Sequence, residues 1–447
     1  MKTNKNTLSE RMAIDWLGFF PEHWQIKRIK DVFGEFGSGT TPQASNPKYY
    51  ENGDIPWLNT SDLNNSIVLD TKIKITKAAI DETSLKMYPK GSFAIAMYGQ
   101  GKTRGTVGLV NFPFTTNQAS CIMFKPKGIG LNYLLFWFNY KYESIRAINV
   151  GASQPNMNQD FVRFLQIHFP PLSEQTAIAY YLDKKTKAID KKISLLEKKI
   201  GYYQELRKSL ITETVTKGLD KSVKFKDSGI DWIGQIPKHW EVKRMKALGN
   251  IETSSVNKKI EDDEALVRLV NYVDVYNNLN KEIWNSDNFM TVSANYLQVR
   301  TKKLKKGDAL FTPSSETIED IGVSAIVMEN LNSTLYSYHL IRLQFSNSFN
   351  IDFKKYMLNN AKVQYYFSHS ATGTTRKILG LNIIYNLPVV FPPSINEQEE
   401  IARFLVDKTR KIDQISMNIK IQITALKELR KTLINDAVTG KIKVINN

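Results

Sequence analysis

The 447-residue sequence has one cysteine, Cys121, so it cannot form an intramolecular disulfide, and we expect a reducing compartment. Long apolar runs are also missing. The most apolar stretch, residues 131–138, is far shorter than a membrane span, and residues 1–12 lack the apolar segment of a signal peptide. The five histidines show no spacing typical of metal ligands. These absences predict a cytoplasmic protein that carries no membrane helix and no metal site.

Charge of one sign is in excess, because the formal net charge is +17. A basic chain often has a polyanionic partner. The excess is spread evenly along the chain, however, and a composition rich in lysine and asparagine can also reflect a genome rich in A and T. Charge alone therefore leaves nucleic acid and other partners about equally open.

The strongest feature that is present is a duplication. Three segments are written twice, namely residues 15–28 as 231–244, residues 169–184 as 391–408, and residues 205–211 (ELRKSLI) as 428–434 (ELRKTLI). A chain of this length predicts two to four domains, and two repeats are too few for a solenoid. We therefore predict two related globular units with pseudo-twofold symmetry, which suits a target that has two halves.

Between the repeated segments lie two stretches, residues 31–168 and 247–390, that mostly differ between the copies. Both contain short apolar runs bounded by turn residues, which predict strands, and longer runs with helical spacing. The expected elements are strands at 93–97, 106–110, 120–124, 309–312, 323–328 and 340–345, equivalent hairpin turns at Lys90-Gly91 and Lys306-Gly307, and helices at 133–148 and 353–367. Each stretch is therefore predicted to be a mixed α+β domain.

Two much longer helical segments follow paired prolines. After Pro171 and Pro393, apolar residues recur mostly every three or four positions, which is typical of a coiled-coil seam. The seam residues are Ile178, Tyr181, Ile189, Ile193, Leu196, Ile200, Tyr203 and Leu210, then Ile401, Leu405, Ile412, Ile415, Ile419, Leu426, Leu429 and Leu433. Ser173 is expected to cap the first helix. Helices of about 44 residues would run about 65 Å, so we predict that the two pack antiparallel as a rigid spacer.

The order and doubling of these features resembles the specificity subunits of type I DNA restriction-modification systems. The shared layout is a Pro-x-His-Trp element, a variable domain, paired prolines before Glu-Gln, and a long helix, all present twice. Local phrases fit as well, at residues 39–42 (GTTP), 55–63 (IPWLNTSDL) and 373–377 (GTTRK). The resemblance covers the whole chain.

The resemblance implies that each variable stretch is a target-recognition domain that reads one half of a split double-stranded DNA sequence. It implies two modification subunits, which methylate adenine with S-adenosylmethionine, and restriction subunits that translocate and cut DNA with ATP and magnesium. It implies no catalytic centre and no cofactor in this chain. The segments common to both copies are the expected docking surface for the modification subunits.

Five segments are therefore expected along the chain. They are a first recognition domain with its scaffold element at 1–172, a spacer helix at 173–217, a connector with the second scaffold element at 218–246, a second recognition domain at 247–395, and a C-terminal spacer helix at 396–440. Half-sites centred about one helical turn, roughly 34 Å, apart would let both domains approach DNA from one side.

Three motifs suggest other chemistry but are incomplete. Residues 96–103 nearly match a phosphate-binding loop, but Ala96 replaces the first glycine and a strand is expected to follow, so we interpret them as a hairpin tip. Residues 36–39 and 46–49 resemble methyltransferase motifs for S-adenosylmethionine and adenine, but they lack the strand-loop-helix frame and the middle proline. A self-contained methyltransferase and a bivalent protein-binding scaffold stay open as alternatives.

Two histidines, His23 and His239, occupy equivalent positions beside Trp24 and Trp240. The sequence shows no partner carboxylate or cysteine near them, and no pattern of paired carboxylates that recurs in both copies. We therefore expect each ring to pack beside an indole in a structural role. No catalytic residue and no metal-binding residue is assigned.

Candidate DNA contacts are loops that hold corresponding places in the two domains but differ in side chain. The corresponding segments are 151–154 with 373–376, 59–62 with 271–274, and 100–104 with 314–317. In the major groove Gln154 suits adenine and Arg376 suits guanine. Ordinary polar turns are the alternative for any one residue. The candidates are Thr40, Thr41, Asn59, Thr60, Ser61, Lys102, Thr103, Arg104, Ser153, Gln154, Asn271, Ser314, Ser315, Thr374, Thr375, Arg376 and Lys377.

The second variable stretch also contains a dense basic run. It comprises Arg300, Lys302, Lys303, Lys305 and Lys306. We interpret this run either as a clamp for DNA phosphates or as a solvated strand edge.

Overall fold

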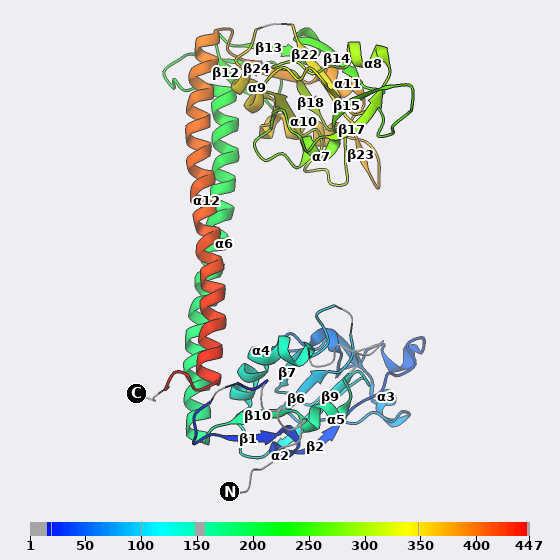
Figure 1. Ribbon diagram of the computed structural model, residues 1–447, viewed down its shortest axis with the longest axis vertical. Helices are drawn as coiled ribbons and strands as arrows, with labels where there is room; N and C mark the ends of the chain where they lie inside the picture. Colours follow the sequence, from blue (N-terminus) through cyan, green and yellow to red (C-terminus); the bar gives the residue numbers. More distant parts are fainter. Residues whose placement is uncertain (1–15, 19, 100, 148–156, 347, 445–447) are drawn as a thin grey trace. The chain divides into compact units, whose positions relative to one another are not determined.

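The computed structural model describes residues 16–18, 20–99, 101–147, 157–346 and 348–444, and it divides the chain into two compact units (Figure 1). The first unit comprises Met1–Leu196 and Ile421–Asn447, and the second comprises Glu197–Lys420. Two long helices, α6 (Leu172–Lys217) and α12 (Ile395–Val438), contribute to both units. Each unit thus contains the start of one long helix and the end of the other.

The first unit is built on a five-stranded sheet in the order β2-β9-β6-β7-β4. Its strands are β2 (Phe33–Gly37), β9 (Ser120–Pro126), β6 (Ser92–Ala96), β7 (Val107–Val110) and β4 (Ser66–Val68). Beside it are the sheet β5 (Ile73–Ile75), β3 (Ile55–Leu58) and β8 (Thr115–Thr116), and the pair β1 (Gln25–Arg28) and β10 (Gln166–Phe169). The shorter helices are α2 (Ile29–Val32), η1 (Pro47–Tyr49), η2 (Thr60–Asp62), α3 (Lys77–Asp81), α4 (Leu131–Ala147) and α5 (Gln159–Phe164).

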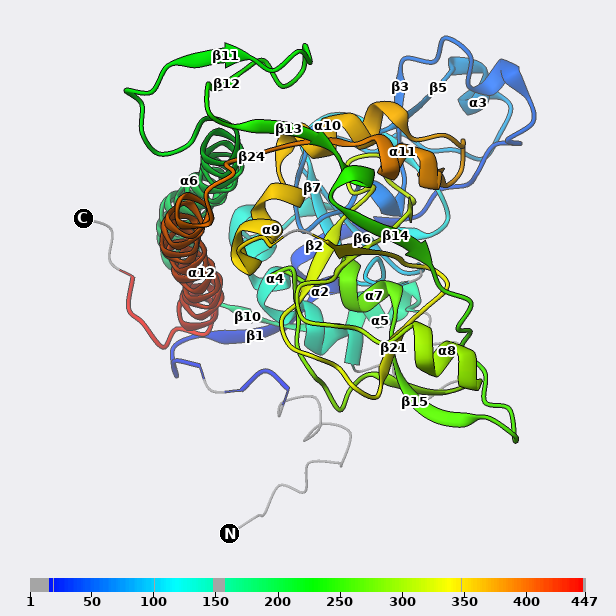
Figure 2. The ribbon, with the colours of Figure 1, turned by 90° about the horizontal axis from the view of Figure 1, so that it is seen from above.

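The second unit has a five-stranded sheet in the order β14-β22-β18-β20-β16. Its strands are β14 (Gly249–Thr253), β22 (Ile341–Phe345), β18 (Ala309–Phe311), β20 (Ser324–Val327) and β16 (Glu282–Ile283). Beside it are the sheet β17 (Met290–Ala294), β15 (Ala265–Val270) and β21 (Thr334–Tyr336), and the pairs β13 (Glu241–Arg244) with β24 (Pro388–Phe391) and β19 (Ser314–Ser315) with β23 (Lys377–Ile378). The shorter helices are η3 (Met245–Ala247), α7 (Tyr272–Tyr276), α8 (Tyr296–Thr301), α9 (Ile351–Leu358), α10 (Ala361–Ser370) and α11 (Leu381–Asn386). The connector adds the hairpin β11 (Phe225–Asp227) and β12 (Gln235–Pro237), which is clear in Figure 2.

The main sheets and the β1-β10 and β13-β24 pairs of the two units correspond strand for strand. Equivalent turns open the central hairpins, because Gly91 and Gly307 both have positive φ and donate their amides to Val110 O (2.8 Å) and Val327 O (2.7 Å). Every described residue of β6 and β7 is buried, as expected for short apolar strands covered on both faces. The α+β class and the duplicated hairpin are confirmed.

One expected helix is broken in two. The segment predicted at 353–367 forms α9 and α10, with Asn359 and Asn360 between them. The Asn360 side chain accepts hydrogen bonds from the amides of Lys362 (2.9 Å) and Val363 (3.2 Å), so it caps a new helix. Such local bonds compete with the helical ladder. The corresponding helix of the first unit, α4, is continuous and confirms the prediction there.

The two long helices are antiparallel within each unit (Figures 1 and 2). In the first unit the start of α6 meets the end of α12, because Leu182 and Val438 share one buried cluster. In the second unit the end of α6 meets the start of α12, where Val215 and Leu405 share another cluster. The predicted antiparallel pairing is thereby confirmed. No helix in the described part of the chain has the apolar length needed to cross a membrane.

Matched ion pairs join the long helices in the two units. Arg430 Nε lies 2.9 Å from Asp190 Oδ1 in the first unit, and Arg207 Nε lies 3.1 Å from Asp413 Oδ1 in the second. Both arginines belong to the repeated ELRK segment. The repeat is therefore preserved in three dimensions as well as in sequence.

Two details of the helix prediction are wrong. Helix α6 begins at Leu172, so Ser173 lies inside its first turn, whereas in the second copy Ser394 does precede the helix and accepts from the Glu397 amide at 3.4 Å. The first copy has one residue fewer between its prolines and Glu-Gln, which removes the cap position. In the seam, Ile415 and Leu429 are 38% and 48% exposed, because the actual helical spacing turns them away from the partner helix.

The second unit contains a buried charge network that predicts a pH-dependent stability. Burial raises the pKa of Asp308 to about 6, and Arg342 lies 3.6 Å from its carboxylate. Because the folded pKa lies above the unfolded value near 3.8, this group stabilises the fold below about pH 4 and the contribution is lost as the pH rises through 6. We expect the second unit to lose on the order of 1 kcal/mol between pH 5 and pH 7.5 from this group.

The measurement is chemical denaturation at several pH values for the parent and for Asp308→Asn. The variant should lack this part of the pH dependence. The first unit has Ser92 at the corresponding place, so its transition serves as an internal control. An unchanged pH profile of the second transition in Asp308→Asn would contradict the assignment.

Candidate nucleic-acid interface

One edge of each unit gathers loops from both of its main sheets. In the first unit β2 and β6 both run antiparallel to β9, so their ends lie at the same edge as the start of β9. Strand β8 is parallel to β3 and leads directly into β9, which brings its end to that edge as well. We call this edge the recognition edge. Its described residues are 38–43, 59–65, 97–99, 101–106 and 117–119 in the first unit, and 254–259, 271–281, 312–323, 337–340 and 371–378 in the second.

In the first unit, the loops at 38–43, 59–65 and 117–119 of the recognition edge carry mostly neutral amide and hydroxyl side chains. Thr41 Oγ1 donates to Gln118 Oε1 at 2.8 Å, and Asn117 Nδ2 donates to Asn59 Oδ1 at 2.9 Å. The Asn59 amide in turn donates to Asp62 at 2.9 Å, which caps the η2 turn. The loops that hold Thr40, Thr41, Asn59, Thr60 and Ser61 are therefore brought together. Gln118, which no sequence motif singled out, is an exposed part of this group.

The β6–β7 connection of the first unit is a hairpin tip, as interpreted from the sequence. Lys102 is exposed at the tip. Arg104 instead turns toward α4, where its Nη2 donates to Arg146 O at 3.1 Å, and Thr103 O accepts from Thr106 Oγ1 at 2.6 Å. Arg146 also donates to Gly101 O at 2.7 Å, which ties the tip to α4. A strand follows the tip, so the geometry of a phosphate-binding loop is absent from this described segment.

The two segments that resemble methyltransferase motifs are residues 36–39 and 46–49, and ordinary local structure accounts for both. Residues 36–39 leave the end of β2 without entering a helix, and Asn46 accepts from the Lys48 amide at 3.2 Å as the cap of η1. Neither segment forms a strand-loop-helix frame.

Three candidate loops of the second unit converge on Tyr272. The Tyr272 hydroxyl donates to Ser314 O at 2.8 Å, and Arg376 is close enough to lower the pKa of the same hydroxyl. Burial raises the pKa of Tyr272, and Arg376 opposes that change. Strand β23 pairs Lys377 with Ser315 of β19, which fixes the backbone next to Arg376. Tyr272 therefore organises the recognition edge in this unit, although its sequence position gave no sign of it.

A second aromatic ring and a carboxylate extend this arrangement. Tyr276 stacks on Tyr272 with ring centroids 5.2 Å apart. The Tyr276 hydroxyl donates to Asp320 at 3.1 Å, and so does the Thr317 hydroxyl. The 312–323 loop is thereby fastened to α7.

The candidate residues differ in exposure. Thr374, Thr375 and Arg376 are exposed, whereas Asn271 and Ser315 are only 5% and 1% exposed and lie beneath the edge. Ser314 and Lys377 are half-buried, and the Lys377 amine donates to Gly373 O at 2.7 Å. Ser153 and Gln154 lie outside the described residues. Among the described candidates of this unit, Thr374, Thr375 and Arg376 are thus the side chains best placed to touch a ligand.

The basic run at 300–306 lies at the other end of β18 from the recognition edge. Residues 302–306 connect α8 to β18, and Leu304 among them forms an isolated antiparallel bridge with Leu331, which agrees with the strand-edge interpretation at that point. Lys302 Nζ pairs with Glu252 at 2.8 Å, and Lys303 O accepts from Arg342. The run is partly occupied by contacts that hold the domain together. Its role as a phosphate clamp stays a prediction that the geometry does not favour.

The duplicated histidines do have a partner carboxylate, in contrast to the expectation. His23 Nε2 lies 2.8 Å from Glu174, and Trp24 Nε1 donates to the same carboxylate at 3.0 Å. In the second unit Glu397 takes the place of Glu174, with His239 Nε2 at 2.9 Å and Trp240 Nε1 at 2.8 Å. Both glutamates belong to the repeated Glu-Gln pairs, so the duplication could have indicated them. Each lies more than 150 residues from its histidine in sequence, and the contact was therefore not predicted. The packing of each His beside its indole agrees with the structural role that was expected.

The other histidines and acids show no metal cluster in the described part of the chain. Burial lowers the pKa of His168 to about 4, so this ring is neutral at pH 7, and its Nδ1 accepts from the indole of Trp137 at 3.3 Å. Burial also raises the pKa of Cys121 to about 12, which leaves an unreactive thiol in the core.

Comparison with known proteins places the chain in a family. The family described as "Type I restriction modification DNA specificity domain" matches residues 21–198 and 237–425, so both copies are recognised. The chain is 25% identical over 451 aligned residues to the MjaIX type I restriction enzyme specificity subunit of Methanocaldococcus jannaschii, an alignment that spans 96% of this chain and 95% of that one. It is 20% identical to the EcoKI specificity subunit of Escherichia coli K12, with 95% and 90% of the two chains covered.

Solved structures agree on the fold. A chain from a type I restriction-modification system superposes with a TM-score of 0.72 at 14% identity, with 95% of this chain and 99% of that chain covered. The HsdS subunit of Thermoanaerobacter tengcongensis superposes with a TM-score of 0.55 at 14% identity, with 95% and 98% covered. Since the family match covers both copies and most of the chain, the protein belongs to the type I restriction-modification DNA specificity subunits.

Proposed function

We propose that this chain reads a bipartite double-stranded DNA sequence, one half-site per unit, and directs adenine methylation and restriction by partner subunits. The observation that carries the proposal is the contrast between constant and variable parts of two equivalent units. The His-Trp-Glu contacts and the helix ion pairs repeat, whereas the recognition edges differ in side chain. A shared scaffold with two different edges suits a target whose halves differ in sequence.

The chemistry of the two edges supports direct readout in the major groove. The first edge offers Thr41, Gln118 and the exposed Lys102, and amide side chains pair well with adenine. The second edge offers Thr374, Thr375 and Arg376, and an arginine pairs with two acceptors of guanine. The long helices then set the gap between the half-sites.

The repeated surface of the long helices supports two identical docking sites. Leu206 and Leu429 occupy the same position of the ELRK repeat and are 52% and 48% exposed. An exposed leucine kept in both copies suits a contact with a partner protein. We propose that two modification subunits dock there and supply S-adenosylmethionine chemistry, while restriction subunits supply ATP, magnesium and DNA cleavage.

The test is DNA affinity of the chain in complex with its modification subunit, measured at several salt concentrations. Phosphate contacts release counterions, so the logarithm of the association constant should fall steeply and linearly with the logarithm of salt. A complex with 6–10 phosphate contacts would lose about 10³- to 10⁵-fold in affinity between 50 and 200 mM salt. A stable complex without measurable DNA binding at low salt would instead favour the protein-binding scaffold, and S-adenosylmethionine binding by the chain alone would favour a methyltransferase.

A further inference from the structure

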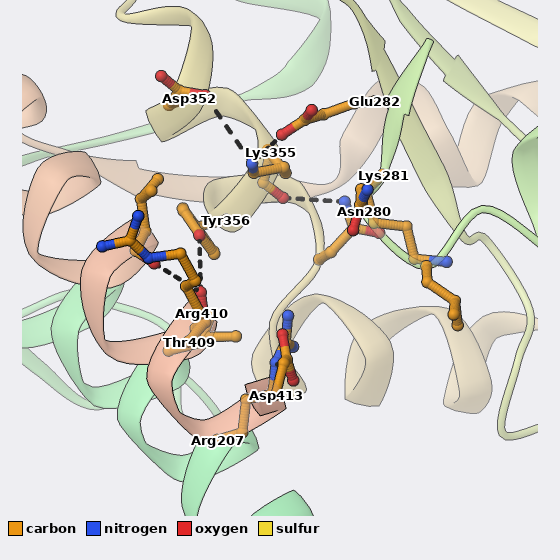
Figure 3. Close-up of a pocket in the computed structure, with 14 residues that line it drawn as sticks. Arg207, Asn280, Lys281, Glu282, Asp352, Lys355, Tyr356, Thr409, Arg410 and Asp413 are labelled. Carbon is orange, nitrogen blue, oxygen red and sulfur yellow. Dashed lines mark hydrogen bonds and ion pairs between the residues drawn. The ribbon is translucent and has the colours of Figure 1, made fainter. Parts of the chain in front are cut away.

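The second unit holds a pocket of about 540 Å³ where its recognition domain meets the two long helices (Figure 3). The turn before β16 and helix α9 line one side, and segments of α6 and α12 line the other. Four cationic side chains are among its lining residues, namely Arg207, Lys281, Lys355 and Arg410. All lie within the second unit.

The carboxylates of the pocket are matched by two of these cations. Lys355 Nζ lies 2.5 Å from Glu282 and 3.8 Å from Asp352. Arg207 pairs with Asp413. Four cations and three acids line the pocket, so its lining has a net charge of +1, and two of the cations have no partner among the lining acids.

Lys281 and Arg410 are those two cations. No hydrogen bond or ion pair joins the Lys281 ammonium to another residue of the described chain, whereas Arg410 is 74% exposed and only reaches Asp407, 3.5 Å away on its own helix. Burial lowers the pKa of Lys281, and the charge of Arg207 lowers it further, although Asp320 opposes them. The charged form of Lys281 is thus disfavoured by burial and by a neighbouring cation, and an anion in the pocket would offset that cost.

The backbone at Lys281 gives an independent reason to assign a role to this side chain. Lys281 has φ +58°, in the left-handed region that costs a non-glycine residue roughly 1 kcal/mol. In the first unit the turn before β4 uses Asn65 at φ +61°, and asparagine tolerates this conformation better. The Asn278 side chain holds the Lys281 turn in place, because it donates to Glu282 O at 2.7 Å. A long cationic side chain therefore stands where a shorter residue would fit the backbone with less strain.

The pocket shares Lys281 with the recognition edge. Lys281 O accepts from the Ile326 amide at 2.9 Å, just after the 312–323 loop. Asp320 of that loop is close enough to act on Lys281, and the same carboxylate accepts from Tyr276. A DNA strand read at this edge would therefore pass the mouth of the pocket.

We propose that this pocket binds a backbone phosphate of the DNA beside the half-site read by the second unit, with Lys281 as the main contact and Arg207 and Arg410 flanking it. The inference rests on the proposed DNA-reading function and adds a phosphate contact beside the side chains that would read bases. Phosphate contacts add affinity and fix register without carrying sequence information. Loss of this contact should therefore weaken DNA binding and reduce its salt dependence, and it should leave the target sequence unchanged.

The experiment uses the complex with the modification subunit and compares the parent with Lys281→Asn, Arg410→Gln and the double variant. Asparagine suits the left-handed turn, as Asn65 does in the first unit, so Lys281→Asn should fold. Each lost contact should weaken binding about 5- to 10-fold at 0.15 M salt and reduce the salt slope by about 1. The methylated sequence should stay the same in all three variants.

The matched control is Lys246→Gln, which removes the same charge from an exposed residue of the same unit, just before β14 and at the end of that strand away from the recognition edge. It should leave the salt slope unchanged. The proposal is overturned if Lys281→Asn keeps the slope of the parent, or if Lys246→Gln lowers the slope as much, since the effect would then be net charge. Failure of the parent complex to bind DNA would instead overturn the proposed function itself.

Discussion

Replacing Arg376 by alanine is expected to relax recognition of one base pair in the half-site read by the second unit, and to weaken binding of that half-site about 10- to 100-fold. Arg376 is exposed on a loop whose neighbour Lys377 is paired with Ser315. The charge of Arg376 also lowers the pKa of the nearby Tyr272 hydroxyl. The side chain thus extends from a fixed backbone, which is the arrangement needed to read a base edge.

The measurement is competition binding with DNA fragments that differ at single positions of either half-site. Arg376→Lys keeps the charge but loses the planar guanidinium, which can donate two parallel hydrogen bonds. It should therefore bind DNA more tightly than Arg376→Ala but discriminate little better between base pairs. Lys377→Gln is the matched control, because the Lys377 amine is already engaged with Gly373 and its loss should leave specificity intact. If Arg376→Ala abolished assembly with the modification subunit while DNA specificity survived, the loop would belong to the scaffold.

Replacing Trp240 by alanine is expected to destabilise the second unit by about 3–5 kcal/mol, as is typical of large-to-small changes in a core. The Trp240 side chain is fully buried and donates to Glu397, which also binds His239. Removal leaves a cavity where the start of α12 packs on the domain. Trp24→Ala should have a comparable effect on the first unit, because Trp24 is 5% exposed and donates to Glu174.

Chemical denaturation followed by hydrogen exchange in each unit would check this pair of variants. Large chains of several domains do not unfold in one step, so the two units must be followed separately. Each variant should lower protection in its own unit first. Glu397→Gln keeps an acceptor for the indole and should cost less than the tryptophan change. Equal loss of protection in both units from Trp240→Ala alone would contradict separate, equivalent cores.

Local patterns predicted the fold well where neighbouring residues decide it. The apolar runs around Phe93 and Val107 became the central strands, because a short run bounded by turn residues has few alternatives. The break at Asn359 and Asn360 was missed, because helical spacing continues across it and only the side-chain hydrogen bonds show it. The carboxylate beside His23 was missed because Glu174 reaches it only through the fold.

At the recognition edge, too, the sequence predicted what local patterns decide and missed what depends on the fold. The duplication allowed corresponding loops of the two units to be aligned. Within each unit, the structure brings the described loops together at one edge. The roles of single side chains could not be predicted, because burial depends on neighbours that are distant in sequence. Asn271 and Ser315 proved to lie beneath the edge, and Tyr272 proved to organise it.

The most direct test of the account is to express this chain with its modification subunit in a host that lacks adenine methylation, and to map modified bases across the genome. The account predicts methylated adenines in a split sequence with two specified halves and a gap of fixed length. A single continuous methylated sequence, or a stable complex that leaves the genome unmodified, would contradict the claim that two different recognition edges read two half-sites.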